Sequence, residues 1–138
     1  MNDKKRLKHG FPVGYYSFHR KKLYNFQLNR LYNFAGADYR DLAEAAGNIQ
    51  SFRTWKEQML SLAVKSEREE NILQAAFYYA AAGFYLFGDM DEKNRLYRRF
   101  RDLFYTDAEE IGLKRFRTPY RNSCLPGIRM EPEGERNA

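Results

Sequence analysis

Apolar residues recur every three or four positions through most of the chain, which is the spacing of one face of an α-helix. In residues 23–35, one apolar face is formed by Tyr24, Leu28, Leu31 and Ala35. Phe26 and Phe34 are expected to broaden this face. Gly36 follows as a stop, because glycine readily adopts the left-handed conformation that ends helices. The pattern predicts a first helix over residues 23–35.

A short second helix is predicted over residues 39–46 from the signals at its two ends. Asp38 can accept hydrogen bonds from the free backbone amides of a first helical turn. Gly47 is expected to end this helix.

A third helix is expected to begin at Ser51 or Thr54. Thr54-x-x-Glu57 has the form of a capping box, in which each side chain satisfies a backbone amide near the other. Four apolar positions follow at helical spacing: Trp55, Met59, Leu62 and Ala63. Ser66-x-x-Glu69 has the same form as the first box, so a turn near residues 65–70 is expected to return the chain antiparallel.

Two further helices are predicted beyond this turn. The stretch over residues 71–87 is apolar nearly all round, so it should be covered on most sides and lie centrally in a bundle. Gly88 is expected to close it, and Asp89-x-x-Glu92 then starts a helix with one apolar side. That side comprises Leu96, Phe100, Leu103 and Phe104.

After Gly112 the pattern changes to that of a β-hairpin. Pro119 and Pro126 discourage helix, and Arg121-Asn122-Ser123 is typical of a turn. A two-stranded hairpin is marginal in water unless more strands or a packed helix support it. The predicted fold is therefore mostly α: an antiparallel bundle of about five helices over residues 23–112, a short C-terminal hairpin over 113–131, and a polar tail over 132–138.

The positive charge is concentrated near the N-terminus. The 138 residues carry 24 Lys and Arg against 18 Asp and Glu, a net charge of +6, and residues 1–22 form a basic arm with interleaved aromatics. Such an arm can bind a phosphate backbone by releasing counterions, but terminal charge runs are more often solvated tails. We expect a solvated tail and do not expect nucleic acid as a partner.

Other chemistry is sparse in this sequence. One cysteine and two histidines give no zinc spacing, and no glycine-rich phosphate loop occurs, so we expect no metal and no cofactor. The most apolar window is too short for a membrane span, and the single cysteine fits a reducing compartment. These observations favour a cytoplasmic protein without a membrane partner.

An ordered series of short segments resembles one known family, the α/β-hydrolases with an N-terminal helical cap. This group includes the FrsA-like esterases and the 2,6-dihydroxypseudooxynicotine hydrolase type. The segments lie in the family's order along residues 24–130: Phe26-Gln27-Leu28-x-Arg30, Gly36-Ala37-Asp38, Trp55 followed by Ala63, the alanine- and tyrosine-rich run from Ala75 to Phe84, Pro119-Tyr120, and Leu125-Pro126-Gly127.

The resemblance implies that the helices form a cap over an active site and that the hairpin starts the sheet of a catalytic domain. Acyl transfer in such enzymes uses a Gly-x-Ser-x-Gly elbow, a histidine base, an acid and oxyanion-binding amides. The 138 residues contain no such set, so we expect no catalytic residue here and a catalytically silent fragment. The implied partners are the missing catalytic domain and the small-molecule ester or related carbonyl substrate of the parent enzyme.

In such a cap, polar groups on apolar helices are the candidates for touching substrate. These are Gln27 and Arg30 beside Phe26, together with the hydroxyls of Tyr78 and Tyr79. Each also has a structural interpretation, namely a surface amide, a salt-bridging arginine and buried tyrosines with satisfied hydroxyls.

Two other functions remain open at this point. Antiparallel helix pairs rich in alanine and tyrosine are also typical of tetratricopeptide-like interaction modules, although no fixed repeat period is present. A basic nucleic-acid-binding module is the third hypothesis. An uncovered hairpin edge and an apolar cap underside also predict a homodimer.

Overall fold

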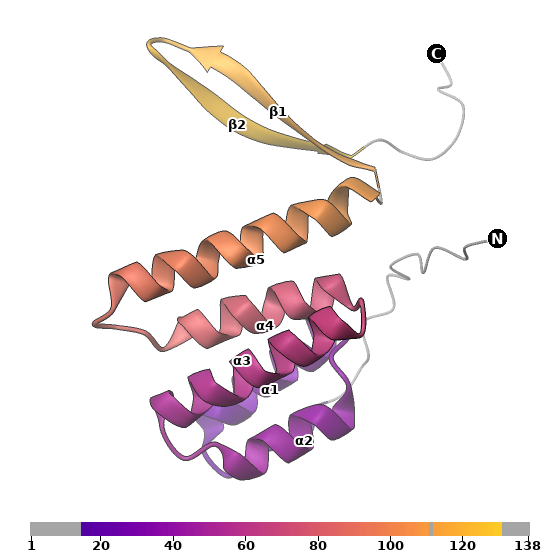
Figure 1. The fold of residues 1–138 in the computed structure, drawn as a ribbon, viewed down its shortest axis with the longest axis vertical. Coiled ribbons are helices and arrows are strands. Elements are labelled where there is room, and N and C mark those ends of the chain that lie inside the picture. The colour runs from indigo at the N-terminus through magenta and orange to yellow at the C-terminus, as the bar shows by residue number, and fades with distance from the viewer. Residues whose placement is uncertain (1–14, 111, 131–138) are drawn as a thin grey trace, which may run out of the picture. The chain divides into compact units, whose positions relative to one another are not determined.

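The computed structural model describes residues 15–110 and 112–130 (Figure 1). It divides into two compact units, Met1–Phe104 and Tyr105–Ala138, with the boundary inside the last helix. The predicted polar tail over 132–138 and the first part of the basic arm lie outside the described residues. The elements are α1 (Lys22–Ala35), α2 (Tyr39–Asn48), α3 (Phe52–Arg68), α4 (Ile72–Phe84), α5 (Met90–Glu110), β1 (Leu113–Tyr120) and β2 (Ser123–Met130). The prediction of a mostly α fold followed by a hairpin is confirmed.

The predicted inner face of α1 is buried, but its expected extension is wrong. The four side chains of that face are at most 7% exposed: Tyr24, Leu28, Leu31 and Ala35. Phe26 and Phe34 are instead 53% and 59% exposed, because both lie outside the buried face of the helix. Gly36 ends α1 as predicted, with φ of 62° and its amide donating to the Leu31 carbonyl.

The predicted N-caps of α2 and α5 are confirmed, whereas α2 does not end at Gly47 as predicted. The Asp38 carboxylate accepts from the amides of Arg40 at 2.8 Å and Asp41 at 3.1 Å. The Asp89 carboxylate likewise accepts from the Glu92 amide at 2.9 Å. Gly47 does not end α2, because its φ is not positive and the helix continues through Asn48.

The capping box of α3 lies one turn earlier than Thr54-x-x-Glu57. Ser51 is the N-cap, its hydroxyl accepts from the Thr54 amide at 3.2 Å, and the Thr54 hydroxyl accepts from the Ser51 amide at 2.9 Å. The expected second box at Ser66 is also wrong, because Ser66 is buried inside α3. The predicted turn near residues 65–70 lies at 69–71, where Glu70 has φ of 59°.

A tertiary contact from another helix satisfies a carbonyl near the end of α4. The predicted helix over 71–87 ends at Phe84, and Gly88 does not close it. The indole Nε1–H of fully buried Trp55 donates to the Ala81 carbonyl at 2.7 Å. This carbonyl is one of the last four of α4, which have no partner within the helix. Beyond it Tyr85 turns into the core and leaves Phe87 71% exposed, so the expected cover on most sides of this stretch is incomplete.

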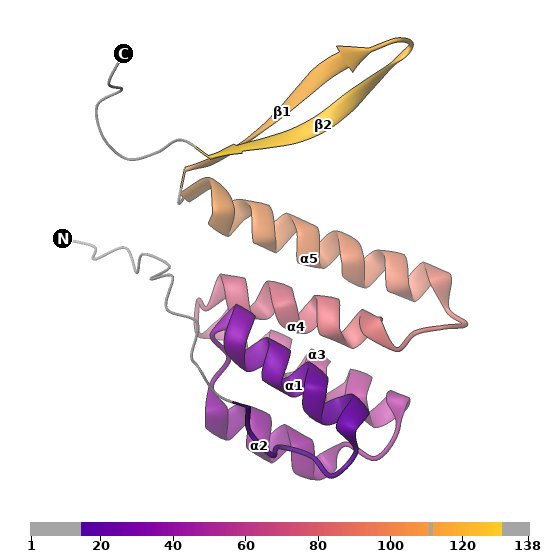
Figure 2. The same cartoon turned by 180° about the vertical axis from the view of Figure 1, so that it is seen from behind.

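The core of the helical unit lies between α1, α2, α3 and α4. Helices α3 and α4 pack along each other as an antiparallel pair, and α1 packs against both α4 and α2 (Figures 1 and 2). Leu96 and Leu103 on α5 are buried as predicted, and Phe100 and Phe104 are half-buried beside them. The predicted apolar side of α5 is confirmed.

The hairpin pairs eight residues of each strand around a turn at Arg121, whose φ is 51°. Phe116 is directly opposite Gly127, and a Cβ at that glycine would lie only 2.8 Å from Cε1 of the Phe116 ring. Neither strand buries a residue. Cross-strand neighbours share a face, so the register places apolar side chains on both faces of the hairpin: Phe116, Tyr120 and Leu125 on one, Ile128 and Met130 on the other.

Candidate functional site

The described part of the basic arm is not a solvated tail, because residues 15–21 pack on the bundle (Figure 2). Asn29 of α1, 2% exposed, holds both polar backbone groups of Tyr16. Its Oδ1 accepts from the Tyr16 amide at 2.7 Å, and its Nδ2 donates to the Tyr16 carbonyl at 2.8 Å. Buried Asn25 accepts from the His19 amide at 3.0 Å. The expectation of a solvated tail is therefore wrong for this segment.

Two aromatic side chains of the arm, Tyr16 and Phe18, pack on helices, whereas Tyr15 is exposed. The ring of Tyr16 lies edge-on to Tyr32 at 5.1 Å and to Tyr39 at 5.3 Å. Phe18 packs 5.0 Å from Tyr39. These two rings tie the arm to α1 and α2, which weakens one of the two features on which the nucleic-acid hypothesis depends.

Two basic side chains of the arm meet the chain that leaves the C-terminal end of α2. His19 Nε2 lies 2.9 Å from the Ile49 carbonyl, and its Nδ1 accepts from the Lys21 amide at 2.9 Å. Because Nδ1 accepts, the donor to Ile49 is Nε2–H, which defines the neutral tautomer. Lys21 Nζ donates to the Gln50 carbonyl at 3.2 Å. Cationic groups are favoured at this end of a helix, and α2 has no basic residue in its own last turn.

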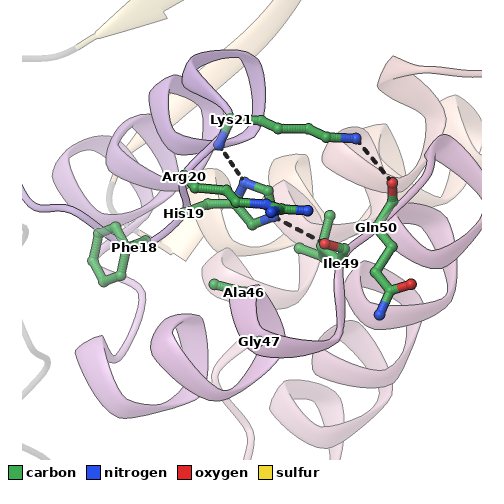
Figure 3. Close-up of a pocket in the computed structure, with 8 residues that line it drawn as sticks. All are labelled: Phe18, His19, Arg20, Lys21, Ala46, Gly47, Ile49 and Gln50. Carbon is green, nitrogen blue, oxygen red and sulfur yellow. Dashed lines mark hydrogen bonds between the residues drawn. The ribbon is translucent and has the colours of Figure 1, made fainter.

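A surface hollow of about 610 Å³ opens between the arm and this end of α2 (Figure 3). Four residues of the arm and four at the end of α2 line it: Phe18, His19, Arg20, Lys21, Ala46, Gly47, Ile49 and Gln50. The lining includes two permanent positive charges and no carboxylate. Sequence reasoning missed this hollow because the arm was expected to be free in solvent.

Three of the five predicted substrate-binding residues lie together on the outward side of α1. We call this surface the outer stripe and define it as Leu23, Phe26, Gln27, Arg30 and Phe34. Their spacing of three or four residues places them within one face of the helix. The three apolar members are 49–59% exposed. Within the stripe, Arg30 Nη1 lies 3.4 Å from Gln27 Oε1, and its guanidinium lies 6.0 Å from the Phe26 ring centre.

Tyr78 and Tyr79 do not join this surface. Tyr78 is 1% exposed, and burial, reinforced by the charges of Asp41 and Asp38, raises the pKa of its hydroxyl strongly. Its hydroxyl has no hydrogen-bond partner among the described residues, so the alternative of a satisfied buried tyrosine does not hold for it. Burial and a hydrogen bond to Glu67 raise the pKa of Tyr79. Neither hydroxyl is placed to meet a ligand at the outer stripe.

Glu67 joins three helices through its partners Tyr79 on α4 and Arg99 on α5. Burial raises the pKa of the Glu67 carboxyl, but the hydrogen bonds from Tyr79 and Arg99 outweigh it and hold the pKa below 4.5. A carboxyl whose pKa is lowered by folding stabilises the fold above its unfolded pKa and loses that contribution as the pH falls through the folded pKa.

We therefore expect Glu67→Gln to lower the free energy of unfolding at neutral pH by at most about 1 kcal/mol, because the Arg99 partner is half exposed. This difference from the wild type should shrink as the pH falls through the lowered pKa of the folded state, below which the carboxyl is protonated in both states. Urea unfolding over a series of decreasing pH values measures it. Glu57→Gln is the control, because the Glu57–Arg53 pair is more exposed. A Glu67→Gln difference that persists unchanged in acid would contradict the assignment.

The comparisons with known proteins leave the chain unassigned. No family model matches it, and no curated protein or solved structure matches it. Among the described residues, no group of three or more His, Cys, Asp or Glu side chains is arranged to hold a metal ion. None of the described helices has the length and apolar character needed to cross a membrane.

Proposed function

We propose that this chain is the cap portion of an α/β-hydrolase and that it is catalytically silent by itself. The outer stripe is the observation that carries the proposal. Helix α1 buries one face in the bundle and presents two phenylalanines and a leucine on the other. A helix that is apolar on both faces is typical of one covered from both sides. In a cap, the second cover is the catalytic domain together with its substrate.

The outer stripe suits the roof of a substrate pocket. Binding sites combine an apolar lining with a few placed polar groups, and the stripe offers two phenylalanines with one amide and one guanidinium between them. In the proposed role, Phe26 and Phe34 exclude water, while Gln27 and Arg30 orient a polar group of the substrate. The serine nucleophile, its histidine base and the orienting acid belong to the catalytic domain.

The hairpin supports the same proposal independently. Apolar side chains on both faces are typical of strands that are covered on both sides, as in a larger sheet packed by helices. The 120↔123 pair closes a two-residue turn and is therefore hydrogen-bonded, and pairs alternate from there along the ladder. Pro119 and Pro126 thus both fall in non-hydrogen-bonded pairs and do not interrupt the bonds between β1 and β2. Because proline has no backbone N–H, the outer edges of the hairpin carry fewer hydrogen-bond donors, which limits unspecific pairing with strands of other molecules. The remaining edge amides are still available for a neighbouring strand.

Labelling by a fluorophosphonate probe and hydrolysis of an aryl ester test whether the chain lacks serine hydrolase activity, as proposed. Highly purified protein should show no labelling and no turnover above buffer, because its serines lack the nucleophile elbow. A full-length serine hydrolase is the positive control for the reagents. Turnover that follows this protein through purification, and that is lost on substitution of one of its serines, would contradict the proposal.

One alternative function makes a different structural prediction. A tetratricopeptide-like module would use helix pairs of matched length, whereas the helices here run from 10 to 21 residues.

The exposed apolar side chains of the outer stripe and the hairpin also favour a homodimer of the isolated chain. Light scattering across a concentration series would distinguish a dimer from a monomer.

A further inference from the structure

The hollow between the arm and α2 has the charge pattern of an anion site. Arg20 and Lys21 contribute two permanent positive charges, and no lining residue carries a carboxylate. Among the residues that the structure describes, no hydrogen bond or ion pair occupies the Arg20 guanidinium. Its donors are therefore available, in a planar fork that matches phosphate and carboxylate oxygens.

Backbone carbonyls near the end of α2 would repel an anion if they were left open, because a helix C-terminus carries partial negative charge. The two carbonyls that follow α2 at the hollow already have donors. His19 is bonded to the Ile49 carbonyl and Lys21 to the Gln50 carbonyl, as Figure 3 shows. These bonds reduce the repulsion between the carbonyls and an anion in the hollow. They also bring the positive charge of Lys21 to the rim of the hollow, while the Arg20 guanidinium stays available for a ligand.

Gly47 supports the same assignment through the space that it leaves. It is the last but one residue of α2 and lines the hollow. Its φ is not positive, and a Cβ added there would meet nothing within 4 Å, so neither backbone conformation nor packing requires a glycine. The missing side chain keeps the side of the hollow next to Ala46 open. A group that enters the hollow can thus approach the α2 backbone closely.

We propose that this hollow binds a small anion bearing a phosphate or carboxylate group, held by the Arg20 guanidinium and the Lys21 ammonium. The proposal does not rest on the cap function, because the hollow and the outer stripe share no residue. Inorganic phosphate and acetate are the probes, titrated at constant ionic strength while the amide signals of Gly47 and Gln50 are followed by NMR. A saturable shift at both positions is expected, and the probe that binds more tightly identifies the preferred anionic group.

Three variants locate the site. Arg20→Gln should weaken binding about tenfold or more, since a charge-assisted hydrogen bond is lost. Gly47→Gln should abolish saturable binding, because its side chain fills the hollow. It leaves the net charge of the protein unchanged and has a higher helix propensity than glycine. Arg53→Gln is the matched control, since Arg53 is an exposed arginine on α3 outside the hollow.

Each outcome decides the proposal. Loss of binding in Arg20→Gln and Gly47→Gln, with Arg53→Gln unchanged, supports it. Shifts that never saturate, equal weakening in Arg53→Gln, or normal binding in Gly47→Gln would each overturn it, because they indicate diffuse attraction to a basic protein or binding at another place.

Discussion

Replacing Trp55 with alanine should lower the free energy of unfolding by about 3–5 kcal/mol, which is a large part of the stability of an ordinary domain. The indole is fully buried. It stacks on Tyr24 at 5.7 Å and meets Tyr85 edge-on at 5.3 Å. Its removal leaves a cavity between α1, α3 and α4 and deprives the Ala81 carbonyl of its donor. Urea unfolding followed by circular dichroism measures the loss, because Trp55 is the only tryptophan.

Trp55→Phe separates the hydrogen bond from the packing. It keeps an aromatic ring but removes the indole N–H, so a loss of about 1–3 kcal/mol is expected from the unpaired carbonyl. The control is Phe87→Ala, a change at an aromatic residue that is 71% exposed, for which an effect within about 0.5 kcal/mol is expected. A Trp55→Ala loss below that of Phe87→Ala would contradict the central position of the indole.

Asn29→Asp should be nearly as damaging, with an expected loss of about 3–5 kcal/mol, although it changes only one polar group. The Asn29 amide nitrogen donates at 2.8 Å to two carbonyl oxygens, those of Tyr16 and Asn25. A carboxylate there would place a buried charge against two carbonyl oxygens and leave the Tyr16 carbonyl without its side-chain donor. Urea unfolding at neutral pH measures the loss. Hydrogen exchange at the Tyr16 amide should show the arm released from α1.

Asn48→Asp is the matched control for this change. The Asn48 side chain also donates to a backbone carbonyl, that of Glu44 at 3.2 Å, but it is exposed. A negative charge at the end of α2 is unfavourable by only about 0.3–1 kcal/mol. Equal losses in the two variants, or unchanged exchange at the Tyr16 amide in Asn29→Asp, would show that Asn29 does not hold the arm.

Some features of this fold that depend on neighbouring residues are predictable, although the stop at Gly47 and the box at Ser66 are not, and features that depend on distant contacts are not predictable. Asp38 and Gly36 act within one turn of their own positions, so the limits of α1 and the start of α2 follow from local rules. A carbonyl near the end of α4 is bound by Trp55, 26 residues earlier in the chain. The arm is held in part by a buried asparagine 13 residues away. A single asparagine on a helix gives no periodic signal, so the sequence pattern contains no sign of either contact.

The candidate site shows the same limit. Gln27 and Arg30 are predictable as candidates because they are polar residues beside Phe26 on an otherwise apolar helix, and helical spacing places the three on one face. The same spacing does not tell which face is buried, and so Phe26 and Phe34 were assigned to the core. Tyr78 and Tyr79 are adjacent on a helix and point in different directions. One is buried toward the charges of Asp38 and Asp41, and the other reaches Glu67.

The central claim is that this helical unit serves as the cap of a serine hydrolase. An antibody raised against residues 15–104 and applied to fluorophosphonate-treated extracts of the source cells tests it most directly. We expect the antibody to precipitate a labelled serine hydrolase, whether cap and nucleophile share one polypeptide or assemble from two, and peptide mapping should place the label in a Gly-x-Ser-x-Gly segment. Efficient precipitation of the helical unit without any labelled polypeptide would contradict the claim.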